Sequence, residues 1–282
     1  MIFSKHFWKE LYTHFMDDDV VGMSAQLAYF FLLSLFPFLI FLLTLIGYMP
    51  IDQSRVFLLI QRYVPGDSLN IITDNIYQLM EERKSGLLSF GLLLTVWSAS
   101  NGINALMRVF NRAYETDENR SFIVTRLISM ALTVAMILVI AVALALPVFG
   151  KAAGAFIFSF LGYSDSFIAF WETIRWVISF VIIIFILTIL YILAPNKSVT
   201  IRHALPGAII ATIGWQLTSL GFAYYVENLG NFSYTYGSLG SIIVLMIWFY
   251  LSGMMLIVGG EVNAVLERHK RRFIKIRKTR MD

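Results

Sequence analysis

Six long stretches without a charged side chain divide the sequence, and apolar residues dominate each of them. They are 20–51, 85–107, 127–150, 176–196, 204–226 and 228–260. The shortest holds 21 residues, and a helix needs about 20 residues to cross the ~30 Å hydrocarbon core of a bilayer. The runs lack the alternation of polar and apolar residues that is typical of barrel strands. The pattern predicts an all-α integral membrane protein, a bundle of six transmembrane helices in a single polytopic domain, 1–282.

Short amphipathic helices are expected beside the spans. In the N-terminal segment 1–19, one helical face carries Phe3, Phe7, Trp8, Leu11, Tyr12 and Phe15, which predicts a helix lying in the membrane interface with its aromatic face down. The segment 52–84 contains a turn followed by a second amphipathic pattern, and predicts two short helices covering the outer side. Segment 152–170 is open to three interpretations: an extension of the third span, a re-entrant segment or a surface helix.

Composition agrees with a membrane protein. Hydrophobic residues make up 58% of the chain and charged residues 14%, against roughly 45–50% and about 25% in soluble domains. The chain has no cysteine, so disulfides and thiolate metal sites are excluded.

The positions of lysine and arginine predict the orientation, because these residues accumulate on the cytoplasmic side. With six spans, 16 of them fall on the side of both termini and 6 on the other. Both termini are therefore expected in the cytoplasm. The basic tail 261–282 favours anionic membrane lipids as partners over nucleic acid, which we do not expect the chain to bind.

Polar residues inside the spans are the candidate functional residues, since they normally face a bundle interior, a cavity or one another. Trp97, Asn101, Asn104 and Arg108 share one helical face of the second span. Gln26 and Tyr29 lie one turn apart in the first span, and Gln216 lies in the fifth. These residues either line a substrate path or join helices by hydrogen bonds.

Pro37 lies deep in the first span. A proline there removes a backbone hydrogen bond and kinks the helix. The kink is either a fixed feature of packing or a hinge.

The uncharged segment 228–240 is dense in Asn, Ser, Tyr and Gly, and includes Asn231, Tyr234 and Tyr236. It is either a tight outer hairpin with aromatic residues at the membrane boundary or a segment that dips into the bundle.

Glu261 and Asn263 follow two glycines at the inner end of the sixth span. Glu261 either marks where the membrane ends or pairs with Arg108 to gate a cavity.

Motifs for catalysis are absent from the sequence. The four histidines have no metal-ligand spacing such as H-E-x-x-H, and neither a Walker loop nor a G-x-S-x-G elbow occurs. We therefore expect no metal site, no cofactor and no ATPase in this chain, and do not expect an enzyme.

Three long motifs carry a family resemblance: SAQLAYFFLLSLFPFL at 24–39, LLTVWSASNGINALMRVFNRAY at 93–114, and NFSYTYGSLGSIIVLMIWFYLSGMMLIVGGEVNA at 231–264. In this order they resemble the YihY/BrkB family of bacterial inner-membrane proteins, once catalogued under a "ribonuclease BN" label. The resemblance implies six helices in the bacterial cytoplasmic membrane and, by proposals made for the family, movement of lipids or other solutes. The ribonuclease label gains no support from a clustered His/Asp metal site.

The leading hypothesis is a membrane transporter or lipid translocase without its own ATPase, acting on an unidentified amphiphile or small molecule. Its path would be lined by Gln26, Tyr29, Trp97, Asn101, Asn104, Gln216, Asn231, Tyr234, Tyr236, Glu261 and Asn263. A non-transporting scaffold or assembly factor is the alternative, and an intramembrane hydrolase is the third. The substrate and the oligomeric state stay open.

Overall fold

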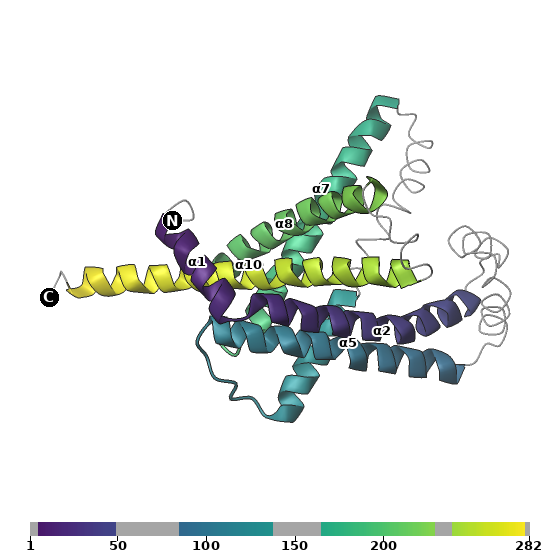
Figure 1. Ribbon diagram of the computed structural model, residues 1–282, viewed down its shortest axis with the longest axis horizontal. Coiled ribbons are helices and arrows are strands. Elements are labelled where there is room, and N and C mark those ends of the chain that lie inside the picture. The colour runs from purple at the N-terminus through teal and green to yellow at the C-terminus, as the bar shows by residue number, and fades with distance from the viewer. Residues whose placement is uncertain (1–4, 49–84, 138–164, 229–238, 280–282) are drawn as a thin grey trace. The chain divides into compact units, whose positions relative to one another are not determined.

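The computed structural model describes residues 5–48, 85–137, 165–228 and 239–279, and the elements within these ranges are helices. They are α1 (Lys5–Asp17), α2 (Val20–Tyr48), α5 (Ser85–Ala113), the helix Phe122–Ile137, α7 (Asp165–Leu193), α8 (Ile201–Asn228) and α10 (Gly240–Thr279) (Figure 1). The predicted all-α fold class is confirmed for this part of the chain.

Three described helices are long and apolar enough to cross a membrane: Val20–Leu42, Ile201–Asn228 and Gly240–Lys270. Phe122–Ile137 and Val177–Leu193 are apolar but shorter. The structure thus supports a helical membrane protein, whereas the predicted number of six spans is not confirmed.

Some predicted features lie outside the described residues. These are the outer helices at 52–84, most of the segment 152–170, the loop carrying Asn231, Tyr234 and Tyr236, and the side chains of the basic tail from position 271 onward. They stay predictions.

The chain divides into two compact units, residues 30–99 and residues 1–29 with 100–282. In the smaller unit, α2 and α5 are in close contact at Gly91, where an added Cβ would lie 3.2 Å from the backbone nitrogen of Phe41. Thr44 and Thr95 donate hydrogen bonds to backbone carbonyls of their own helices. In this way their hydroxyls are satisfied without a partner helix.

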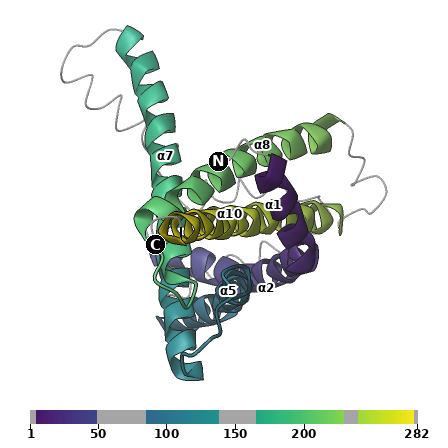
Figure 2. The same ribbon diagram turned by 90° about the vertical axis from the view of Figure 1, so that its left-hand side faces the viewer.

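In the larger unit, α10 packs along α8, α7 packs against α8, and α1 lies across α10 (Figures 1 and 2). Small residues permit the close approach of α8 and α10, because a Cβ on Gly207 would overlap the carbonyl oxygen of Gly259 and the side chain of Asn263. Pro206 disturbs the hydrogen-bond ladder in this turn of α8. The fully buried Asn263 amide accepts a bond of 2.7 Å from the Gly207 N–H and donates one of 2.9 Å to the Ala204 carbonyl.

The aromatic face of α1 is divided between the protein interior and the surface. Phe7 and Leu11 are buried against Val262 and Val265 of α10, whereas Trp8 and Tyr12 are 56% and 62% exposed. Part of the face that we predicted to lie against lipid therefore packs on α10. The helical period places both sets on overlapping faces, so the pattern alone does not distinguish lipid from a partner helix.

The corner between α1 and α2 directs Asp18 inward. Asp19 adopts a positive φ of 50°, and its carboxylate accepts a hydrogen bond from the Gly22 N–H as a cap for α2. A Cβ on Gly22 would collide with this carboxylate, which explains the glycine. The turn leaves Asp18 only 6% exposed.

A second corner fixes the loops at the same end of the unit. Asn111 donates a hydrogen bond of 2.8 Å to the carboxylate of Glu118 and accepts one of 2.6 Å from the backbone N–H of Asn196. Arg120 donates 2.7 Å to the carbonyl of Pro195. Hydrogen bonds from side chain to backbone thus join the loop after α5 to the loop before α8. They hold the adjacent charged residues in defined positions.

Candidate functional site

Two clusters of acidic and histidine side chains lie where α1 meets α10. The His269 cluster consists of His6, Glu10 and His269, and the Glu261 cluster consists of His14, Asp18 and Glu261. In each, one nitrogen or oxygen atom per residue lies within 4.8 Å of the others. Both contain a histidine and an acid four residues apart, which places the two side chains on one face of a helix.

Glu261 is the least solvated charged residue among those described. It is 1% exposed, and neither carboxylate oxygen accepts a hydrogen bond from a described residue. The Oδ2 atom of Asp18 is likewise buried without a hydrogen bond. Burying a carboxylate without a donor is costly, so two facing carboxylates are stable only if they share a proton or bind a cation.

Positive groups approach this cluster from the side of Asp18. His14 Nδ1 lies 3.6 Å from Asp18 Oδ2, and Arg112 Nε lies 4.0 Å from Asp18 Oδ1. Arg268 donates to the His14 ring and to the carbonyl of Ala113 at the end of α5. None of these contacts supplies a donor to Glu261.

Burial governs the titration of the neighbouring groups. It raises the pKa of Asp18, against the lowering effect of the positive charges of His14, Arg112 and Arg268. Burial also raises the pKa of Tyr114, and the charges of Glu267 and Glu261 act in the same direction. The Tyr114 hydroxyl has no hydrogen-bond partner among the described residues, so it is a neutral donor available close to the two glutamates.

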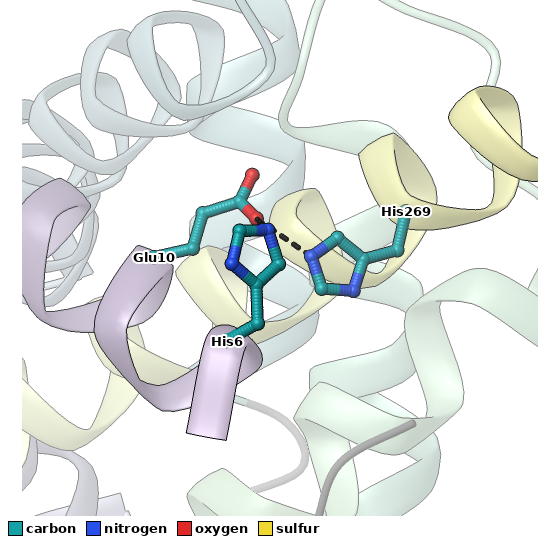
Figure 3. A group of neighbouring side chains, drawn as sticks. All are labelled: His6, Glu10 and His269. Atoms are coloured by element: carbon teal, nitrogen blue, oxygen red, sulfur yellow. Dashed lines mark hydrogen bonds and ion pairs between the residues drawn. The ribbon is translucent and has the colours of Figure 1, made fainter. Parts of the chain in front are cut away.

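The His269 cluster differs in being paired and partly open to solvent (Figure 3). His269 Nε2 lies 2.6 Å from Glu10 Oε2, and His6 Nε2 lies 3.7 Å from the same oxygen. The imidazole rings of His6 and His269 stack with centroids 5.4 Å apart. The side chains of His269 and Glu10 are 8% and 11% exposed, whereas that of His6 is 70% exposed.

The predicted pair of Arg108 and Glu261 is not formed. Arg108 is exposed, and its guanidinium lies 3.4 Å from the Gln26 side-chain oxygen. The face of α5 that meets α10 carries Phe110, whose ring would collide with a Cβ on Gly260. Arg108 precedes Phe110 by two residues, about 200° around the helix, so it is directed away from Glu261.

The other predicted path residues in the described part of the chain differ in their surroundings. Asn101 accepts a 2.7 Å hydrogen bond from Arg126, and Asn263 is used by the α8 backbone. Tyr29 and Trp97 are 59% and 52% exposed. The remaining two, Asn104 and Gln216, are half-buried. Pro37 lies within α2 as predicted.

Five of the six cluster residues are not among the site residues predicted from the sequence; Glu261 is the exception. The expectation of no metal site considered only spacing along the chain, and His269 is more than 250 residues from its partners. One local signal was present: His6 with Glu10 and His14 with Asp18 repeat a histidine–acid pair at an interval of eight residues.

Comparison with known proteins identifies relatives over nearly the whole chain. Residues 11–282 match the family described as virulence factor BrkB. The ribonuclease-like protein YfkH of Bacillus subtilis (strain 168) is 49% identical over 94% of this chain and 96% of its own length. A UPF0761 membrane protein of Alteromonas mediterranea is 28% identical over 89% of this chain and 84% of its own length. No solved structure matches the chain.

Proposed function

The chain belongs to the BrkB family of membrane proteins, and from this premise we propose that it is a membrane transporter, specifically a lipid translocase without its own ATPase. The observation that carries the proposal is the buried carboxylate of Glu261, which lacks a hydrogen bond from any described residue and faces Asp18. Ionisable groups in membrane helices are costly and are characteristic of ion and proton pathways.

The Glu261 cluster supplies a mechanism for coupling. A proton or small cation bound between Asp18 and Glu261 neutralises the pair, and its release leaves two facing negative charges. Because like charges in a poorly solvated site repel strongly, the two states favour different packing of α1 against α10. An exchange of this kind provides the energy input that a chain without a Walker loop needs.

An amphiphilic substrate fits the surroundings of the cluster. The exposed face of α1 presents Trp8, Tyr12 and Met16 at intervals of four residues, which is typical of a helix at a membrane interface. Substrate headgroups at that interface would therefore lie close to the corner that carries Asp18.

Reconstituted protein tests the proposal. Translocation of a fluorescent phospholipid between leaflets is measured in liposomes with and without an imposed pH gradient. We expect gradient-dependent translocation by the natural protein, a protein-free background rate for Glu261→Gln, and a normal rate for Glu227→Gln, an exposed acid at the end of α8. Equal rates in the natural protein and Glu261→Gln would contradict the proposed coupling.

A non-transporting scaffold is the second candidate, and Asn263 favours it. Both functional groups of this fully buried amide hold the backbone of α8, as expected of a polar residue that only joins helices. A scaffold predicts that Asn263→Leu and Glu261→Gln affect stability or assembly, with no lipid movement by any variant.

A further inference from the structure

We propose that His6, Glu10 and His269 form a binding site for a divalent transition-metal ion of the Zn²⁺ class, which fastens α1 to α10. This site is separate from the proposed transport and does not depend on it. It combines two imidazoles with one carboxylate (Figure 3). Such a ligand set is typical of zinc sites that keep a fourth position for water.

The ligand types select the metal. Imidazole nitrogen suits zinc, copper, nickel and iron, whereas magnesium and calcium prefer oxygen ligands in greater number. With only one carboxylate in the cluster, Mg²⁺ and Ca²⁺ would lack most of their ligands.

The distances are close to those that a tetrahedral ion requires. Ligand bonds of about 2.0–2.2 Å place neighbouring ligand atoms roughly 3.4 Å apart. Glu10 Oε2 lies 3.7 Å from His6 Nε2 and 2.6 Å from His269 Nε2. The first of these distances is slightly longer and the second shorter than the ion requires, so binding needs a shift of the Glu10 carboxylate away from His269.

Two of the three ligands are held in place before any metal binds. Phe7, fully buried, meets the His269 ring edge to face with centroids 6.2 Å apart. His269 donates through Nε2 to Glu10, and metal binding through this nitrogen requires only the tautomer that carries the proton on Nδ1. His6 and Glu10 belong to the same face of α1, so the third ligand is presented by helix geometry.

The exposure of His6 lets an ion reach the cluster from solvent. It also allows His6 to be replaced without disturbing the fold. Its side chain is 70% exposed, so replacing it with alanine removes a ligand without opening a cavity. His203 is the matched control: it lies at the same end of the unit, contacts Thr200 and Lys270, and is not part of the cluster.

The test is calorimetric titration of the full-length, chelator-treated protein with Zn²⁺, prepared without a polyhistidine tag. We expect one ion per chain, affinity at least about tenfold weaker in His6→Ala, and unchanged affinity in His203→Ala. Absorption of bound Co²⁺ gives a second readout, and its tetrahedral bands should be lost in His6→Ala.

Three results would overturn the site. They are absence of stoichiometric binding by the natural protein, equal affinity in His6→Ala, and loss of binding in Glu261→Gln with His6→Ala unaffected. The last result would place the ion in the Glu261 cluster. Elution volume in size-exclusion chromatography and the metal-free melting temperature establish that each variant is folded.

Discussion

The His269 cluster and the Glu261 cluster are built from the same parts at the same interval. Each takes a histidine and an acid from the N-terminal segment and one residue from α10, and corresponding positions are eight residues apart along both segments. The earlier pair of α1 meets the later residue of α10, so the two segments run in opposite directions. The clusters are therefore two successive contacts of one helix crossing.

Their chemistry nevertheless differs, because the α10 residue is a base in one cluster and an acid in the other. His269 provides a donor for Glu10, and the pair is satisfied at 2.6 Å. Glu261 adds a second carboxylate beside Asp18, and both Glu261 oxygens and Asp18 Oδ2 are buried without a hydrogen bond from the described residues. A single change of residue type thus separates a ligand set for a transition metal from a site for a proton or small cation.

Metal addition should produce the largest difference between the clusters. Zn²⁺ at 100 times its dissociation constant stabilises the native state by about 2.7 kcal/mol, which corresponds to an increase of several degrees in melting temperature. We expect this increase in the natural protein and in Glu261→Gln, and an increase no more than about half as large in His6→Ala. A melting-temperature series with Zn²⁺ and with a chelator measures it, and an equal increase in His6→Ala would contradict the distinction.

Arg268→Gln should damage the Glu261 cluster and leave the His269 cluster intact, although residues 268 and 269 are neighbours. Arg268 contacts His14, the Ala113 carbonyl and Glu115. Losing charged hydrogen bonds of this kind costs about 2 kcal/mol. Chemical denaturation should show this loss, while Zn²⁺ affinity stays unchanged.

Arg108→Gln provides the control for that experiment. Its guanidinium is exposed and reaches only Gln26, at 3.4 Å. A surface substitution of this type changes the free energy of unfolding by no more than about 0.5 kcal/mol. Equal losses in the two arginine variants would mean that Arg268 has no special place beside the cluster.

Neutralising the acids should change stability in opposite directions. Glu261→Gln replaces a carboxyl group that must share a proton or bind a cation with an uncharged amide that offers its own N–H group to Asp18, so we expect a gain of about 1 kcal/mol at neutral pH. Glu10→Gln weakens the bond to His269 and should lose a similar amount. Denaturant unfolding of both variants measures the signs, and a loss in each would place the two acids in the same category.

The separation of the interacting residues along the chain decides which features of the fold and of the two clusters could be predicted from the sequence. Uncharged runs of more than 20 residues report the environment of each residue directly, so the helical membrane class was predictable. The face shared by Phe7 and Trp8 was predicted as amphipathic, but which part meets α10 depends on Val262 and Val265, far away in the chain. Both clusters combine residues of the N-terminal segment with a residue of α10 that is equally far away in the sequence, so neither cluster was predicted.

The pH dependence of stability should show the smallest difference between the two clusters, and this difference comes from Asp18. Its pKa is raised above the ordinary value of 3.8 by burial, so the unfolded chain loses this proton at lower pH than the native protein does. The stability contributed by Asp18 is complete below that value and falls as the pH rises through the raised pKa. His14, Arg112, Arg268 and Glu261 face the same group and are present in every variant. The difference between the natural protein and Asp18→Asn therefore isolates Asp18, and Asp17→Asn, at an exposed position, serves as the control.

Melting temperatures are measured from about pH 4 to about pH 7. They should decline less steeply with pH in Asp18→Asn than in the natural protein and in Asp17→Asn. Parallel curves would show that the burial of Asp18 does not couple its proton to folding.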